Sequence, residues 1–307
     1  YRKALAEIES MVRLVTRQAL PEISETRSRP AFICNVSKDE FCAMVEKAKK
    51  YITEGDIFQV VLSRRFETEY NDSLLNAYRV LRTTNPSPYM VFLQKDDIQV
   101  ISTSPETLVR LQNGKLTTLP IAGSRPRGKD TDEDMALEKE LLEDEKELAE
   151  HNMLVDLARN DLGRISEYSS IKVTSYKKIQ KYSRIMHITS EVEGRIREGL
   201  DAFDAVEAIL PAGTLSGAPK FRACEIIEEL EKEPRGIYGG AIGYVDYTGN
   251  MDICIAIRMA VRKNDRVYIQ AGAGIVADSN PEKEYEESGN KARAVMEAII
   301  SAGEVNE

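Results

Sequence analysis

The chain has 307 residues, with 51 Asp and Glu against 42 Lys and Arg, so its formal net charge is −9, and 42% of its residues are apolar. This composition is typical of a folded globular protein and excludes a disordered chain. A net negative charge without a dense basic stretch argues against nucleic acid or an anionic membrane surface as a partner, because both recruit clusters of Lys and Arg.

The sequence also indicates where the protein works and how it is divided. No run approaches the roughly 18 apolar residues that a membrane span needs, and the N-terminus lacks the apolar core of a signal peptide. Cys34, Cys42, Cys224 and Cys254 have no metal-type spacing and indicate free thiols in a reducing compartment, so we expect a cytoplasmic protein. The chain opens at Tyr1 rather than Met, so we expect a fragment. Residues 1–30 are predicted to be a residual helix and a linker from a truncated N-terminal region, and residues 31–307 to be one domain.

Hydrophobic periodicity predicts the elements in chain order. Ser37 followed by Glu40 is a capping-box signature for the first helix of the domain. Helices are expected at 37–51, 73–82, 132–162, 202–209, 220–231 and 281–301. Strands are expected at 57–66, 89–93, 99–102, 107–111, 116–119, 171–176, 185–192, 238–247, 252–261 and 267–271. Consecutive strands joined by short turns pair antiparallel, so the predicted class is α+β.

Two pairs of glutamates share one spacing, three residues apart on a predicted helix. Glu147 and Glu150 form one pair, and Glu284 and Glu287 form the other. Residues at this spacing project from one helix face, roughly 60° apart. Two carboxylates about 5 Å apart repel by roughly 3 kcal/mol at an effective dielectric of about 20, so a buried pair needs a cation or a proton. Each pair is either a solvated acidic face or part of a site for a hard cation such as Mg²⁺.

Other segments indicate anion binding or proton transfer. The glycines at 272 and 274 follow a strand, but residues 278–281 separate them from the next helix, so we expect a backbone nest rather than a dinucleotide site. Arg258 would share one strand face with small residues that leave room for a carboxylate, although an ordinary surface ion pair is the alternative. His187 would point away from the core face of its strand, to solvent or to a site, with a pKa suited to proton transfer near neutrality.

Taken in order, eight segments resemble those of the chorismate-utilising enzymes, closest to the large subunits of anthranilate synthases. They are DIFQVVLSRRF, STSPETLVRL, LPIAGSRPRG, ELAEHNMLVDLARNDLGR, LPAGTLSGAPK, YGGAIGYVD, CIAIRMAV and AGAGIVADSNPEKEYEESGNKA. The resemblance covers about residues 31–305 and implies a catalytic domain of large antiparallel sheets flanked by helices, with a Mg²⁺ site between them.

The resemblance also implies roles for individual residues. Mg²⁺ would be coordinated, directly or through water, by Glu150 and Glu287, with Glu147 and Glu284 beside them. The residues implied in binding chorismate are Tyr238, Arg258, Lys291 and the backbone of Gly272, Ala273 and Gly274. The residues implied in catalysis are His187, Thr214 and Glu147, the last as the acid that assists the leaving hydroxyl.

Two positions indicate the nucleophile. Relatives that form isochorismate or salicylate have a water-activating lysine where this chain has Gln59, and aminodeoxychorismate relatives have a nucleophilic lysine where it has Ala122. Ammonia attack remains, so the resemblance implies conversion of chorismate and ammonia to anthranilate and pyruvate, the first step of tryptophan biosynthesis. The alternatives are an aminodeoxychorismate or aminodeoxyisochorismate synthase, and a non-catalytic module that binds chorismate or tryptophan.

The resemblance further implies partners. No Cys, His and Glu amidotransferase constellation occurs here, so ammonia would come from glutamine on a separate glutamine amidotransferase subunit. The segment Asn85, Pro86, Ser87, Pro88, Tyr89 and Met90 resembles the tryptophan feedback segment of the family. Tryptophan is therefore expected as a feedback inhibitor, although the other half of its pocket would lie in the truncated N-terminal region.

Overall fold

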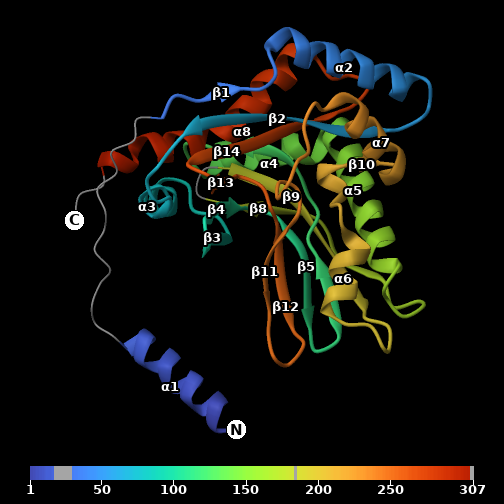
Figure 1. Ribbon diagram of the computed structural model, residues 1–307. Helices are drawn as coiled ribbons and strands as arrows, with labels where there is room; N and C mark the ends of the chain where they lie inside the picture. The colour runs from blue at the N-terminus through green and yellow to red at the C-terminus, as the bar shows by residue number, and fades with distance from the viewer. Residues whose placement is uncertain (17–29, 183–184, 305–307) are drawn as a thin grey trace.

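The computed structural model describes residues 1–16, 30–182 and 185–304. These residues form two seven-stranded antiparallel sheets with helices packed around them (Figure 1), which confirms the α+β class. None of the helices in these ranges combines the length and the apolar composition that crossing a membrane requires. The expected linker lies almost wholly outside the described residues, so the division at residue 30 stays a prediction.

The first sheet is built around one long pair of strands, β2 (Gln59–Glu69) and β14 (Arg266–Ile275). Their register places Val61 opposite Gly274 and Ser63 opposite Gly272. The other strands of this sheet are β1 (Ile33–Cys34), β3 (Tyr89–Lys95), β4 (Ile98–Ser104), β10 (Gly217–Ala218) and β13 (Met259–Lys263). The strand order is β1-β2-β14-β13-β4-β3, with β10 paired to β2.

The second sheet has the order β11-β12-β5-β6-β9-β7, with β8 paired to β9. Its strands are β5 (Thr107–Gln112), β6 (Lys115–Thr118), β7 (Ile121–Pro126), β8 (Lys172–Lys181), β9 (Ile185–Arg195), β11 (Ala241–Val245) and β12 (Met251–Ile255). Strand β7 was not expected from the sequence. It pairs with β9 across a register shift between Ala122 and Ser124, and this irregular ladder matches the weak alternation of the segment.

Helices cover the apolar faces of the sheets, except for the first helix, which has no buried residue. They are α1 (Arg2–Thr16), α2 (Lys38–Thr53), α3 (Leu75–Thr84), α4 (Thr131–Glu143), α5 (Glu145–Gly163), α6 (Ala202–Ile209), α7 (Lys220–Leu230) and α8 (Pro281–Ile300), with short 3₁₀ turns η1 (Gly213–Leu215) and η2 (Ser301–Glu304). Ser37 and Glu40 form the expected capping box at α2. Figure 1 shows α2 and α8 along the first sheet, and α5 and α6 beside the second.

The alternation of side chains along β2 and β14 explains how the two sheets pack together. Val60 and Leu62 face the helical side, in a core cluster with α2 and α7. Val61 faces the other way and packs in the core cluster of the second sheet and helices α5 and α6. Gly272 and Gly274 lie on this same side of the first sheet because they are opposite Ser63 and Val61. Any site built from them therefore lies between the sheets.

The predicted helix over 132–162 is wrong in one respect, because it is two helices that meet at Asp144. The Asp144 backbone is extended, with φ −74° and ψ 103°, and its carboxylate accepts hydrogen bonds from the amides of Lys146 and Glu147. An aspartate that caps the next helix competes with continued helix through its own position. The break allows α5, which carries Glu147 and Glu150, to run in a different direction from α4.

The predicted strand over 252–261 is also wrong, because β12 and β13 belong to different sheets. Strand β12 ends at Ile255 and β13 begins at Met259, and Arg258 between them has a left-handed backbone, with φ +49°. The expected shared face of Cys254, Ala256, Arg258 and Ala260 therefore does not exist. The apolar run at 252–261 has the pattern of one strand because both halves are buried. Only the tertiary structure shows that its halves belong to different sheets.

Candidate active site

A cavity of about 190 Å³ lies where the two sheets meet. Two short connections between the sheets line it: Pro105 and Glu106, between β4 and β5, and Ile257 and Arg258, between β12 and β13. The remaining wall comes from β2, β14, η1, α8 and Tyr238, which precedes β11. Six of the residues implied from the sequence line this one cavity: Thr214, Tyr238, Arg258, Gly272, Gly274 and Lys291.

Arg258 supplies a cation in a constrained position. One side-chain and one backbone donor of β4 hold this backbone: Ser102 Oγ donates to the Ile257 carbonyl at 2.9 Å, and the Thr103 amide donates to the Arg258 carbonyl at 3.0 Å. A left-handed non-glycine residue costs of order 1–3 kcal/mol, and such residues cluster at functional sites. Burial lowers the pKa of the guanidinium, while Tyr238 and Glu287 act in the opposite direction.

Tyr238 and the glycine strand form the wall next to Arg258. Burial raises the pKa of the Tyr238 phenol to about 12, so it stays a neutral hydrogen-bond donor at physiological pH. The glycines do not form the expected backbone nest, since they belong to the regular ladder of β14 with β2. Their glycine identity comes from close approach: a Cβ on Gly272 would lie 2.6 Å from the Leu62 carbonyl oxygen, and one on Gly274 would lie 2.6 Å from Gln59 Nε2.

Glu106 is a candidate that sequence reasoning missed. Its carboxyl group lines the cavity, and burial raises its pKa to about 7, with Thr214 and Lys291 acting in the opposite direction. A carboxylic acid with this pKa is partly protonated at neutral pH and can donate a proton. The signal in the sequence was the segment STSPETLVRL, which contains Glu106, but Glu106 has no second carboxylate at the three-residue spacing of the two glutamate pairs.

Lys291 joins the cavity to the glutamates of α8. Its ammonium donates to the Gly272 carbonyl oxygen at 3.1 Å and lies 2.6 Å from Glu287 Oε1, one helical turn away. The half-exposed Glu287 therefore lies beside the cavity rather than in its wall.

The two glutamate pairs share their electrostatic neighbours although they come from distant helices. Burial raises the pKa of Glu150, and repulsion from Glu147 and Glu287 adds to this shift. Burial also raises the pKa of Glu284, again with repulsion from Glu287. Lys146 and Lys291 act in the opposite direction on both carboxyl groups. Helices α5 and α8 therefore present their carboxylates to one region.

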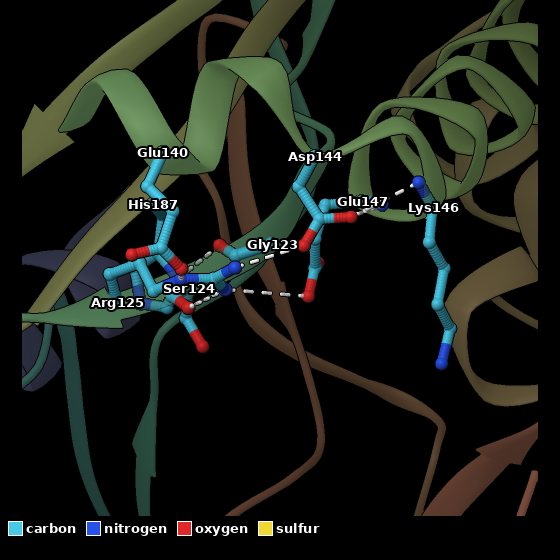
Figure 2. Close-up of polar contacts among 8 residues, drawn as sticks. All are labelled: Gly123, Ser124, Arg125, Glu140, Asp144, Lys146, Glu147 and His187. Atoms are coloured by element: carbon cyan, nitrogen blue, oxygen red, sulfur yellow. Dashed lines mark hydrogen bonds and ion pairs between the residues drawn. The ribbon is translucent and has the colours of Figure 1, made fainter. Parts of the chain in front are cut away.

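These carboxylates do not form a closed ligand cage. Among the residues that the structure describes, no three acidic, histidine or cysteine side chains lie close enough together to hold a metal ion. Glu147 is instead directed to β7, where its Oε1 lies 3.7 Å from Arg125 Nη1 (Figure 2). Arg125 also contacts Glu140 and Asp144, each at 2.9 Å, and so ties α4, α5 and β7 together.

His187 also reaches β7. Its Nδ1 lies 3.1 Å from the carbonyl oxygen of Gly123 (Figure 2). A carbonyl only accepts, so Nδ1 carries the hydrogen and Nε2 has a free lone pair in the neutral ring. Burial lowers the pKa of His187, which favours that neutral form. His187 does not line the cavity between the sheets.

The expected feedback segment lies at the end of α3 and the start of β3. Thr103 Oγ1 donates to the Asn85 carbonyl oxygen at 2.7 Å, and the Tyr89 hydroxyl donates to Asp252 Oδ1 at 2.8 Å. Pro88 and Tyr89 line a second cavity, of about 580 Å³, together with Arg110 and Asp252. Both cavities include Pro105 in their walls, so both adjoin the connection between β4 and β5.

Comparison with known proteins identifies the class that this fold and site define. A family model described as chorismate binding enzyme matches residues 2–297, so the chain belongs to that family. This confirms the resemblance predicted from the sequence, and the family implies a metal cofactor in general.

Among individual proteins, the chain is similar to anthranilate synthase component 1. It is 56% identical over 282 residues to that of Acetivibrio thermocellus, covering 92% of this chain and 57% of the relative. It is 52% identical over 310 residues to that of Aquifex aeolicus, covering all of this chain and 63% of the relative. The crystal structure of anthranilate synthase component I from Streptococcus pneumoniae matches with a TM-score of 0.87 and 48% identity, over 96% of this chain and 66% of that one. The chain thus spans about three fifths of these curated relatives.

Proposed function

We propose that this chain carries the catalytic part of an anthranilate synthase, which converts chorismate and ammonia to anthranilate and pyruvate in tryptophan biosynthesis. The observation that carries the proposal is the cavity between the sheets, where Arg258 and Lys291 face an ionisable carboxyl group, Glu106. Two cations suit a small substrate with two carboxylates, and an acid with a pKa of about 7 suits the loss of a hydroxyl group. The names of the most similar relatives support the same activity.

The side chains at the two discriminating positions support ammonia as the nucleophile. Gln59 lies at the start of β2, is 5% exposed and approaches Gly274, and its amide has no basic nitrogen. Ala122 is buried in β7 and offers no amine. Neither position supplies the lysine that would activate water or attack the ring itself, so an external amine nucleophile is needed.

The residues of this chain then take the following roles. Arg258 and the neutral Tyr238 hydroxyl bind the enolpyruvyl carboxylate, and Lys291 with the Gly272–Gly274 backbone binds near the ring carboxylate. Glu106, rather than Glu147, donates the proton to the leaving hydroxyl, because Glu106 lines the cavity and has the raised pKa. Glu147 instead lies 3.7 Å from Arg125 and is not part of the cavity wall. Thr214 lines the cavity together with Glu106 and contacts the substrate, and the neutral His187 ring, outside that wall, assists proton movement through Nε2.

The donor set of the two helices fits Mg²⁺. All four side chains are carboxylates, the hard oxygen donors that Mg²⁺ prefers, and their mutual repulsion is the kind that a cation relieves. Mg²⁺ commonly takes one or two carboxylates and keeps several waters, so Glu150 and Glu287 would hold it without a three-residue cage. When bound, the ion would supply positive charge that offsets and orients the substrate carboxylate.

We also propose the partners and the location that accompany this reaction. Ammonia would come from glutamine on a glutamine amidotransferase subunit, in keeping with the component naming of the relatives. Tryptophan would act as an inhibitor through the segment at Pro88 and Tyr89, which lines the second cavity. The free thiols of all four cysteines support a cytoplasmic location.

One assay tests the activity. Purified protein is mixed with chorismate and a saturating ammonium salt near neutral pH, with and without Mg²⁺. Anthranilate fluorescence is followed, and the products are identified by mass spectrometry. We expect anthranilate and pyruvate only when Mg²⁺ is present. A product that keeps the enolpyruvyl group would make the chain an aminodeoxychorismate or aminodeoxyisochorismate synthase. Chorismate binding without turnover would make it a non-catalytic module.

A further inference from the structure

A buried ion pair lies directly behind the cavity between the sheets. Glu231 caps the C-terminus of α7, and Arg235 lies four residues further along the chain. Arg235 Nε donates to Glu231 Oε2 at 2.8 Å, and Arg235 Nη2 donates to Glu231 Oε1 at 2.5 Å. The side chains are 17% and 6% exposed, for Arg235 and Glu231 respectively. Burying such a pair costs desolvation that its attraction only partly offsets, so stability alone is a weak reason for it.

The guanidinium of Arg235 also donates hydrogen bonds to backbone carbonyls in the cavity wall. Nη1 donates to the Leu215 carbonyl oxygen at 2.5 Å, and Nη2 donates to the Val61 carbonyl oxygen at 2.6 Å. The guanidinium carbon also lies 5.8 Å from the centroid of the Tyr238 ring. Val61, Leu215 and Tyr238 all line the cavity, and they come from three separate segments of the chain. One planar group thus sets the spacing of three parts of the wall.

Glu231 extends the same contacts to a fourth part of the wall. Its Oε1 accepts hydrogen bonds from the Ser63 amide at 2.7 Å and from the Ser63 hydroxyl at 2.9 Å. Ser63 Oγ in turn accepts a hydrogen bond from Gln270 Nε2 at 2.8 Å, and Gln270 lines the cavity. Neither Glu231 nor Arg235 lines that cavity. Arg235, Tyr238 and Gln270 line another cavity, of about 350 Å³, on the far side of this wall.

We infer that Glu231 and Arg235 are a positioning pair for the substrate cavity, holding Val61, Leu215, Tyr238 and Gln270 at the separation that chorismate binding requires. The inference rests on the proposed function for the identity of the ligand. It depends on the planar fork of arginine, which directs several donors at fixed angles, whereas a lysine ammonium is a compact charge without that geometry. The pair touches neither the substrate nor the reacting atoms.

Arg235→Lys tests the inference, with Arg222→Lys as a matched control. Arg222 lies on α7 and also makes a two-point contact with a carboxylate, at 2.9 and 2.8 Å from Asp56 Oδ2, and it also lies over a tyrosine ring, that of Tyr51. None of these partners lines the cavity. We expect Arg235→Lys to raise the KM for chorismate about tenfold or more, with a smaller change in kcat, since small displacements in a site are costly. Arg222→Lys should leave both constants unchanged.

Ser63→Ala is a milder variant that keeps the ion pair and the amide bond from residue 63 to Glu231, and removes the hydroxyl that joins Glu231 to Gln270. We expect a smaller rise in the KM for chorismate, with a melting temperature close to that of the wild type. Calorimetric binding of chorismate with Mg²⁺ but without ammonium measures the same effect apart from turnover. If the wild type binds chorismate but forms no anthranilate, the proposed function fails, and the binding constants still decide the inference. An unchanged affinity in Arg235→Lys, or an equal loss in Arg222→Lys, would overturn the inference.

Discussion

Glu147 of α5 and His187 of β9 meet at one residue, Gly123 of β7. The His187 ring nitrogen Nδ1 lies 3.1 Å from the Gly123 carbonyl oxygen, and a Cβ added to Gly123 would lie 3.1 Å from Glu147 Oε2. Gly123 has φ +69°, a backbone conformation that side chains rarely adopt. This glycine therefore brings a carboxylate and an imidazole together on a strand that only the structure revealed.

Gly123→Ala should disturb both side chains at once. The new methyl group would also lie 3.2 Å from Ile188 and 3.2 Å from Leu141, so neither side leaves it room. We expect a loss of about 1–3 kcal/mol in the free energy of unfolding from the backbone and the contacts. We also expect kcat to fall roughly tenfold or more from displacement of Glu147 and His187. Urea unfolding and the anthranilate assay measure the two effects.

Gly114→Ala is the control for Gly123→Ala. Gly114 has φ +78° and no atom within 4 Å of the added methyl, so it has the backbone cost without the contacts. Its variant should lose stability and keep its kcat. If both variants lose activity equally, the activity loss follows from stability and not from the pairing of Glu147 with His187.

Glu106→Gln should remove the proposed acid. An amide does not supply the proton, so kcat should fall roughly 10²–10⁴-fold. In the wild type, activity that depends on protonated Glu106 should fall as pH rises through about 7. Variant and wild-type pH profiles, measured with saturating ammonia, test this. A wild-type limb near pH 7 that persists in the variant would assign that limb to another group.

The same carboxyl group should affect stability in a defined direction. Its pKa is raised from 4.5 to about 7 on folding, so the folded state binds more protons between these values. The contribution of Glu106 to stability is therefore full below pH 4.5 and is lost as pH rises to about 7. Relative to Glu106→Gln, the wild type should lose up to about 3 kcal/mol across that range. Thermal melting of both proteins at several pH values measures the difference.

His151 should make the free energy of unfolding depend on pH, as a buried neutral histidine does. It is fully buried, its Nε2 lies 2.6 Å from Ser190 Oγ, and burial lowers its pKa from 6.5 to about 4. The unfolded state then binds more protons between pH 6.5 and 4, so stability falls as pH falls through this range. We expect the wild type to lose up to about 3 kcal/mol relative to His151→Gln there. If the free energies of unfolding of the two proteins change equally with pH, His151 is not a neutral buried group.

Glu150→Gln should weaken Mg²⁺ binding without unfolding the protein. Removing one carboxylate donor should raise the Mg²⁺ concentration for half-maximal activity, and the calorimetric dissociation constant, roughly 10–100-fold. Glu145→Gln on the same helix is the control, because Glu145 is exposed and has no role in the proposed site. Because the pKa of Glu150 is raised, Mg²⁺ affinity in the wild type should also fall as pH falls. Equal affinities in the two variants would remove Glu150 from the metal site.

The class and most elements followed from periodicity and capping, because those signals are local. Helix α2 illustrates this, since Ser37 and Glu40 are only three residues apart and form the predicted capping box. The break at Asp144 was also local in principle, since aspartate followed by Glu147 is an N-cap pattern, but the charged periodicity on both sides concealed it. The division between Ile255 and Met259 was not local, because each half alone is an ordinary buried strand.

The site residues show the same limit. Lys291 and Tyr238 were implied from the sequence only through resemblance, and Arg258 was first proposed from a strand face that the structure does not contain. The approach of all three to one cavity depends on connections that no spacing rule describes. Glu106 follows a proline on a short connection, and its raised pKa arises from burial contributed by segments far along the chain. The sequence indicates which side chains have suitable chemistry. Which of these side chains lie together in one cavity depends on the tertiary structure.

The two connections at 105–106 and 257–258 place the cavity at the junction of the two sheets. Because both connections lie in the wall of one cavity and each joins the two sheets, a molecule bound there contacts both connections at once. Binding of a ligand in this cavity should therefore slow backbone amide exchange in both sheets together, including strands that do not contact the ligand.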